Sequence, residues 1–251
     1  MSTADLSEVT CTAVEPFHLQ MITQAGMAPD VREAVGSPEW FWKPGSTLKV
    51  HFMNGSRELK ERVAAIADEC TQFMSLRFRF YYDAPPLRFR HIPIPGGGRN
   101  RVPVGLATDI AVSFWSDGGG RSYTGSYSRK ISRTGQSSMD LPLSGNRQVV
   151  LHEFGHALGL HHEHQNPTNQ IQWNVAVVYK YYADNHGWTK EMVDTNILQQ
   201  LSRSSTNFTA FDAKSIMLYP ILPQHTLNGY STDWNQELST EDKRFMRRTY
   251  L

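Results

Sequence analysis

Apolar residues near the start of the chain alternate in two short runs and recur at helical spacing between them. Residues 48–52 alternate apolar and polar side chains, which is typical of a half-buried strand. After Ser56, a residue type favoured at helix N-termini, the apolar side chains of residues 59–73 share one helix face. A second alternating run at residues 76–80 completes a predicted β-α-β unit.

The next part of the chain predicts a loop and two further strands. Residues 84–107 are rich in proline and glycine, which favours a long surface loop. Residues 109–115 have the apolar character of a buried strand. Residues 137–143 form a shorter candidate strand, and Pro142 near its end favours a position at the edge of the sheet.

Helical signals dominate the second half of the chain. Asn146 precedes one predicted helix, and another ends at Gly187, which can adopt a left-handed conformation. A third helix is expected after Thr189. The last begins at Ser239, where Asp242 at the third following position approximates a capping box. A sheet lobe followed by a helical lobe is consistent with a cleft between them.

The size and composition of the chain indicate a soluble globular protein. Its 251 residues suit a single domain over residues 40–251, preceded by an extension at residues 1–39 that has no clear periodicity. The formal net charge is only +1, so no global field favours nucleic acid. No apolar run is long enough for a membrane span. The oligomeric state is open, with a monomer favoured.

The start of the chain leaves the cellular location open. The first thirty residues contain no lysine or arginine and no apolar run, so they do not resemble a secretory signal. A cytoplasmic protein, a protein exported by an unconventional route and a secreted protein without its leader are all compatible with this.

The histidines are unusually clustered, because five of the ten fall within thirteen positions. His152 and His156 are four residues apart on a predicted helix, so their rings lie on the same side and can grip one metal ion. Glu153 follows the first of them, where its carboxylate can reach a metal-bound water. Gly159 can end the helix and return the chain, which would bring His162 to the same ion. Three neutral imidazoles leave a tetrahedral zinc ion one open position for water.

The competing interpretation is a chance run of histidines or a purely structural metal site. Chance is a poor explanation, because five specified residues stand at fixed offsets. The other two clustered histidines, His161 and His164, lie between and beyond the ligand positions, and we expect them to have surface or supporting roles.

At these residues the sequence resembles the metzincin metallopeptidases. Residues 152–162 match the signature H-E-x-x-H-x-x-G-x-x-H, and residues 215–219 match the downstream methionine turn S-x-M-x-Y. Glu163, directly after the third histidine, points to the astacin-like branch. The resemblance implies an α+β fold with one catalytic domain. It comprises a twisted, mixed five-stranded sheet, an active-site helix and a mainly helical C-terminal lobe, with the cleft between the two lobes.

The resemblance also implies a function and the residues that perform it. It implies a zinc endopeptidase with one catalytic Zn²⁺ bound by the three histidines and with Glu153 as general base and acid. Met217 would form an apolar floor beneath the zinc ion. Tyr219 would be a switchable ligand that turns to stabilise the oxyanion. Glu163 would be a structural anchor that can meet a mature N-terminus, and the alternative is a solvated side chain or one in a local salt bridge.

The expected partner is a protein or peptide substrate bound as an added strand, because main-chain hydrogen bonds give affinity without reading sequence. The predicted edge strand is the candidate binding surface. Its residues are Ser137, Ser138, Met139, Asp140 and Leu141.

Several family features are missing from the sequence. The Arg and Asp residues that usually follow the signature are absent, as is the inhibitory motif F-x-G-D in residues 1–39. Cys70 lies on an apolar helix face, which favours a core thiol over a disulfide. Cys11 could cap the zinc ion as a thiolate latch in an inactive precursor, or it could be an ordinary thiol in the extension.

Two other functions remain open. The first is a non-catalytic zinc-containing binding or adaptor protein that retains the fold, and the intact Glu153 argues against it. The second is a different hydrolase, since H-E-x-x-H alone occurs in other chemistries. His162 together with the methionine turn narrows that alternative.

Overall fold

The structure, a computed structural model, describes residues 40–93, 99–115, 119–203 and 208–251. The predicted extension at residues 1–39, which includes Cys11, lies outside the described residues. A five-stranded sheet has the order β2-β1-β5-β7-β6, with parallel neighbours except for the antiparallel pair β6 and β7. The predicted mixed five-stranded sheet is therefore confirmed. Its strands are β1 (Thr47–Phe52), β2 (Arg77–Tyr81), β5 (Ile110–Trp115), β6 (Arg121–Ser122) and β7 (Met139–Pro142).

The predicted β-α-β unit is present at the start of the sheet. Helix α2 (Arg57–Asp68) connects the parallel strands β1 and β2, and the Ser56 hydroxyl accepts a hydrogen bond from the Leu59 amide at 3.2 Å. The 3₁₀ turn η4 (Glu69–Phe73) then carries Cys70, which is fully buried in the core. The expectation of a core thiol at this position is confirmed.

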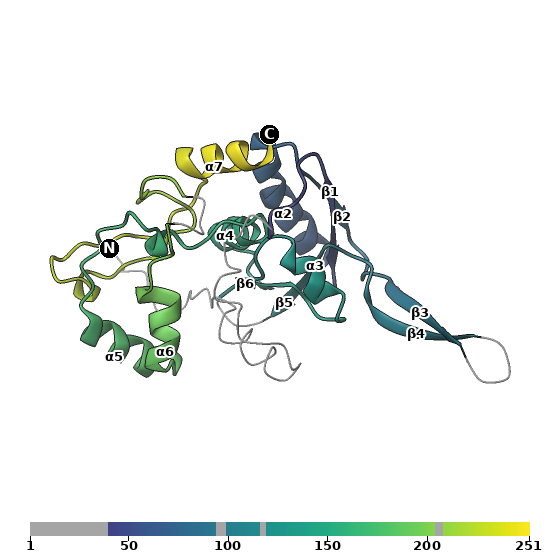
Figure 1. The fold of residues 1–251 in the computed structure, drawn as a ribbon, viewed down its shortest axis with the longest axis horizontal. Coiled ribbons are helices and arrows are strands. Elements are labelled where there is room, and N and C mark those ends of the chain that lie inside the picture. Colours follow the sequence, from purple (N-terminus) through teal and green to yellow (C-terminus); the bar gives the residue numbers. More distant parts are fainter. Residues whose placement is uncertain (1–39, 94–98, 116–118, 204–207) are drawn as a thin grey trace.

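The predicted surface loop over residues 84–107 is wrong. Strands β3 (Leu87–Pro93) and β4 (Arg99–Leu106) form an antiparallel two-stranded sheet, which projects from the rest of the fold (Figure 1). The proline and glycine content of this segment favours a loop when the sequence is considered alone. A two-stranded ribbon has two open edges, so it tolerates prolines that an interior strand would exclude, and the glycine run falls between the two strands.

The predicted edge position of residues 137–143 is also wrong. Strand β7 pairs with β5 on one side and with β6 on the other, where Met139 lies opposite Ser122 and Asp140 opposite Arg121. Pro142 is tolerated because it is the last residue of β7 and lies beyond the two residues paired with β6. The strand at this edge of the sheet is therefore the two-residue strand β6.

The second half of the chain is mainly helical, as predicted. Gly187 ends α5 with a φ of +65°, and the Thr189 hydroxyl caps α6. Ser239 and Asp242 form a complete capping box at the start of α7. The helical elements of the described chain that follow the sheet's first strands are α3 (Tyr127–Ser132), α4 (Arg147–Ala157), η5 (Glu163–Gln165), α5 (Val175–His186), α6 (Lys190–Val193), the π-turn η6 (Asp194–Leu198), η7 (Pro223–His225) and α7 (Thr240–Tyr250).

Two apolar clusters contain most of the buried apolar side chains of the described residues, and α4 itself belongs to the larger one. The larger one packs the sheet against α2, α4 and α7, and the smaller one joins α5, α6 and η6 to Tyr219. Helix α4 occupies the middle of the molecule, between the sheet and the pair α5 and α6 (Figure 1). Among the described residues, no helix is long and apolar enough to cross a membrane.

Candidate metal centre

Helix α4 is almost completely buried. Every residue from Val149 to Ala157 is buried, including the polar residues His152, Glu153 and His156. Asn146 stands at the N-cap as predicted, but its side chain makes no capping hydrogen bond. Packing on all sides, rather than capping, therefore holds this helix and keeps its polar residues away from bulk water.

A tight turn after α4 reverses the chain. Gly159 has a φ of +88°, which only glycine adopts without strain, and the Leu160 amide donates to the Gly155 carbonyl at 3.0 Å. A Cβ at position 159 would lie 2.7 Å from the Phe41 ring, so space also requires glycine here. The turn returns the chain to α4 and places His162 beside the two helix histidines, as the sequence predicted.

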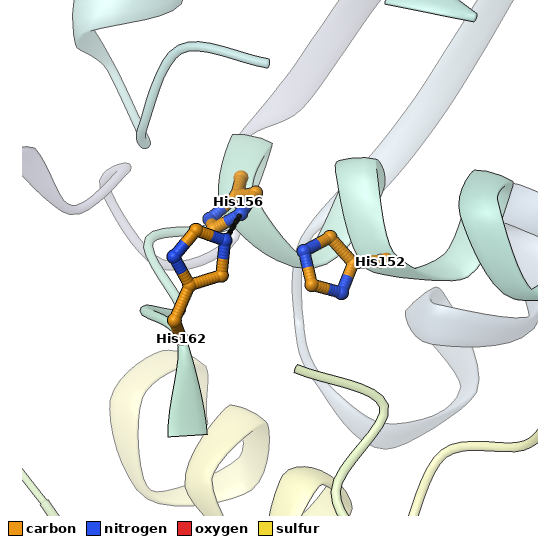
Figure 2. Close-up of side chains that lie close together, drawn as sticks. All are labelled: His152, His156 and His162. Carbon is orange, nitrogen blue, oxygen red and sulfur yellow. Dashed lines mark hydrogen bonds between the residues drawn. The ribbon is translucent and has the colours of Figure 1, made fainter. Parts of the chain in front are cut away.

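The three histidines converge (Figure 2), and their ligand atoms all lie within 4.8 Å of one another. The closest pair is Nε2 of His156 and Nε2 of His162, which are 3.0 Å apart. Main-chain carbonyls accept hydrogen bonds from the other ring nitrogen of each of the two helix histidines. His152 Nδ1 lies 2.8 Å from the Ile216 carbonyl and His156 Nδ1 lies 2.9 Å from the Leu160 carbonyl. These bonds leave both Nε2 lone pairs directed at the centre of the cluster.

The chemistry of this cluster fits a zinc ion. Nε2 of His152 is buried and has no hydrogen-bond partner among the described residues, which is unusual for a buried polar atom. Two nitrogens bound to one tetrahedral zinc ion lie about 3.3 Å apart, close to the observed spacing of His156 and His162. Burial lowers the pKa of His156 to about 4 and the pKa values of His152 and His162 well below the ordinary value. All three rings are therefore neutral at pH 7 and can act as metal ligands.

The Glu153 side chain projects from α4 toward the edge of the sheet. Its side chain is fully buried, and a Cβ at Gly120 would lie 2.7 Å from its Oε1 atom. Gly120 directly precedes β6, so the Glu153 carboxylate faces the edge strand. The absence of a side chain at Gly120 provides the room that this carboxylate occupies.

The backbone of the methionine turn bonds to the first histidine of the triad and to the residue that follows the third. The Ile216 carbonyl bonds to His152, and the Met217 carbonyl accepts from the Glu163 amide at 3.0 Å. The Met217 side chain is buried against α4, where a Cβ at Gly155 would lie 2.5 Å from its sulfur. The turn therefore packs directly beneath the helix that carries two of the three histidines.

Asp242 has a second role that its sequence signal did not reveal. Besides capping α7, its buried carboxylate accepts hydrogen bonds from the Ser215 hydroxyl at 2.7 Å and from the Ile216 amide at 2.8 Å. The capping box thus fixes the methionine turn to the C-terminal helix. Only the pairing within the helix was visible in the sequence, because the turn lies more than twenty residues away.

Tyr219 reaches the histidine cluster from the smaller apolar cluster. Its ring centroid lies 5.6 Å from that of His152 and 4.4 Å from that of His162. His164 is also buried here, with its ring centroid 4.9 Å from that of Tyr219. His161 is half-buried. Of the two histidines expected to have surface or supporting roles, His164 therefore lies beside the centre, although it has no ligand spacing.

Glu163 faces a cavity behind the metal centre. Its Oε1 accepts from the Asn166 side chain and from the Asp212 amide, both at 2.8 Å. Burial is the main cause that raises the pKa of Glu163 to about 8. Asp212, Glu241 and Asp242 line the same cavity. The wall of this cavity is therefore acidic.

We predict that replacing Glu163 by Gln changes how stability depends on pH. The pKa of Glu163 is near 4.5 when exposed and about 8 in the folded protein, so folding favours the protonated form. The stability that protonated Glu163 contributes to the folded protein is fully present below pH 4.5, and it is lost as the pH rises through 8. Glu163→Gln should therefore gain stability relative to the wild type between pH 5 and 9.

Thermal unfolding of both proteins in the same buffers measures this difference. Glu191→Gln, which removes an exposed carboxylate, is the matched control for the loss of a negative charge. A stability difference between Glu163→Gln and the wild type that does not vary with pH would show that the Glu163 carboxyl has no raised pKa.

Similar proteins were found only among solved structures. One structure of myroilysin is 30% identical, covers 84% of this chain and 96% of its own, and has a TM-score of 0.71. Another structure of myroilysin is 27% identical, with 89% and 96% covered and a TM-score of 0.57. High choriolytic enzyme 1, a hatching enzyme zinc-protease from the medaka fish Oryzias latipes, is 15% identical, with 84% and 94% covered and a TM-score of 0.53. This last likeness shows the fold alone. No protein-family model matches the chain, and no curated protein sequence matches it.

Proposed function

The chain belongs to the astacin family of zinc metalloproteases, and we propose that it is an endopeptidase that cleaves protein or peptide substrates with zinc. The observation that carries this proposal is the buried histidine triad with Glu153 on the same helix. A structural zinc site would not need a carboxylate in this position, and it would be closed by a fourth ligand.

The three histidines would hold the zinc ion through their Nε2 atoms. Zinc bound there would supply a Lewis acid that polarises the scissile carbonyl and makes a bound water acidic near neutral pH. Glu153 would accept a proton at its carboxylate as water attacks, and would return it to the departing amine. Its burial supports this role, because a carboxylate removed from bulk water is not already hydrated.

Tyr219 would stabilise the developing oxyanion by donating a hydrogen bond from its hydroxyl group. The support for this role is position, since the Tyr219 ring lies against both His152 and His162. Met217 would provide the apolar floor of the site, as its burial beneath α4 suggests.

The substrate would add as a strand to β6 rather than to β7. In the strand that the sequence predicted to bind substrate, Met139 and Asp140 are already paired with β6. Strand β6 is the outer strand of the sheet, and it lies beside Glu153. Strand addition at this edge would place a peptide backbone next to the carboxylate.

We expect a non-cleavable peptide analogue to slow amide hydrogen exchange at Ser122. Its amide faces the open edge, because the Tyr123 amide donates to the Ser138 carbonyl of the neighbouring chain segment and antiparallel pairs alternate in direction. The matched control is β2, which is the strand at the opposite edge of the sheet and should exchange at an unchanged rate. Slower exchange at β2 together with an unchanged exchange rate at β6 would contradict this mode of binding.

Cleavage of a denatured protein by the wild type and by Glu153→Gln, with bound zinc measured in both, tests the proposed function as a whole.

A further inference from the structure

Three aromatic rings pack together beside the metal centre, and only one of them, His162, belongs to the histidine triad. The His164 ring lies 5.1 Å from that of His162 with an interplanar angle of 18°, and 4.9 Å from that of Tyr219 with an angle of 28°. The His162 and Tyr219 rings are themselves 4.4 Å apart. The ring centroid of His152 lies 5.6 Å from that of Tyr219, and the interplanar angle of these two rings is 17°. The Tyr219 ring therefore has stacked imidazole neighbours in both His152 and His164.

A hydrogen bond to the helical lobe fixes the His164 ring. Its Nε2 lies 2.8 Å from the main-chain carbonyl of Asn196, so this nitrogen carries the hydrogen and donates it. The backbone of His164 is held as well, since its carbonyl accepts from the Asn169 side chain at 2.6 Å. With 1% of its surface exposed, His164 has little freedom to change its rotamer.

The partner carbonyl is available because Asn196 lies in the π-turn η6 (Asp194–Leu198). A π-turn disturbs the regular helical hydrogen bonds and leaves carbonyl groups for other donors. The next side chain along from His164 uses the same turn, because Gln165 donates to the Thr195 carbonyl at 2.7 Å. The Asn196 side chain donates to the Met192 carbonyl at 2.7 Å, which ties the turn to α6.

We propose that His164 is a positioning residue for Tyr219. Its ring, tethered to η6, is the wall that holds the Tyr219 ring against the histidine triad. The inference rests on the proposed function, in which Tyr219 acts on the reacting carbonyl. The Trp234 ring is less suited to this role, since its centroid is 6.3 Å from that of Tyr219 and it is not stacked on it.

Two variants separate the ring from its tether. His164→Phe keeps an aromatic ring but cannot donate to Asn196, and His164→Gln can donate but has no ring. Each should lower kcat about tenfold, because small displacements of a positioned group cost that much or more. KM should stay within about twofold, and zinc content should equal that of the wild type. Gln165→Ala removes the neighbouring tether without touching Tyr219, so its kcat should be unchanged.

A double-mutant cycle with Tyr219→Phe distinguishes positioning from general packing. If His164 acts through Tyr219, His164→Phe should cause no further loss of kcat in the Tyr219→Phe background. The same relative loss in both backgrounds would overturn the proposal, because it would show that His164 acts on something else.

A second readout does not depend on activity. In protein labelled with ¹³C in its tyrosine rings, the Tyr219 resonance is identified by its absence from Tyr219→Phe. That resonance should shift or broaden in His164→Phe and stay in place in Gln165→Ala. An unchanged Tyr219 resonance in His164→Phe would refute positioning even if the proposed peptidase function holds. Conversely, wild-type cleavage by Glu153→Gln would refute the proposed mechanism without affecting this measurement.

Discussion

Replacing Glu153 by Gln is expected to lower the rate of cleavage of a denatured protein by about 10²–10⁴-fold, the range over which general acid–base groups contribute. Gln has nearly the same shape as Glu but cannot accept and return a proton. The histidine ligands are untouched, so the variant should bind as much zinc as the wild type. Cleavage rate, zinc content and thermal unfolding, measured on the same preparations, check this result.

Glu191→Gln is the control, because it makes the same chemical change at an exposed position of α6. It should cleave at the wild-type rate. A Glu153→Gln variant that retains zinc and wild-type activity would falsify the proposed mechanism. If the wild type binds zinc but cleaves no substrate, the protein is the non-catalytic zinc-containing binding protein that the sequence left open.

Replacing His156 by Ala is expected to remove both zinc and activity. His156 is one of three ligands, and its Nε2 lies 3.0 Å from that of His162. Two remaining imidazoles cannot complete a tetrahedral site with one open position. Loss of affinity should exceed the roughly 10–100-fold effect of removing an outer hydrogen-bond partner of a ligand. Metal analysis after dialysis and a zinc titration measure this loss.

His186→Ala serves as the matched control, since His186 is a histidine on α5 outside the triad. It should retain zinc and cleavage. Because removing a buried side chain can destabilise the fold, circular dichroism of His156→Ala should show that it remains folded. A folded His156→Ala protein that binds zinc as tightly as the wild type would contradict the assignment of the ligands.

The residues of the metal centre could be predicted because their arrangement is largely local. The spacing of His152 and His156 on one helix fixes their relative position whatever the rest of the chain does. Gly159 signalled the reversal that delivers His162, and its positive φ agrees with that prediction. The capping box at Ser239 was readable for the same reason, since both of its residues lie within one turn of a helix.

Weak or misleading local signals account for the wrong predictions. Strand β6 has only two residues, too few for an alternating pattern, so the edge was assigned to β7. The prolines and glycines of residues 84–107 favoured a loop, although a two-stranded ribbon accommodates them at its open edges.

By itself, the sequence determined the helix that carries two of the candidate metal-binding histidines, the turn that follows it and the family to which they point. Local backbone geometry is enough for these features. Only the tertiary structure decided which strand forms the edge beside Glu153, that Asp242 holds the methionine turn and that His164 lies against Tyr219. These contacts join segments far apart in the chain, and their formation depends on how the whole core packs rather than on the spacing within any one segment.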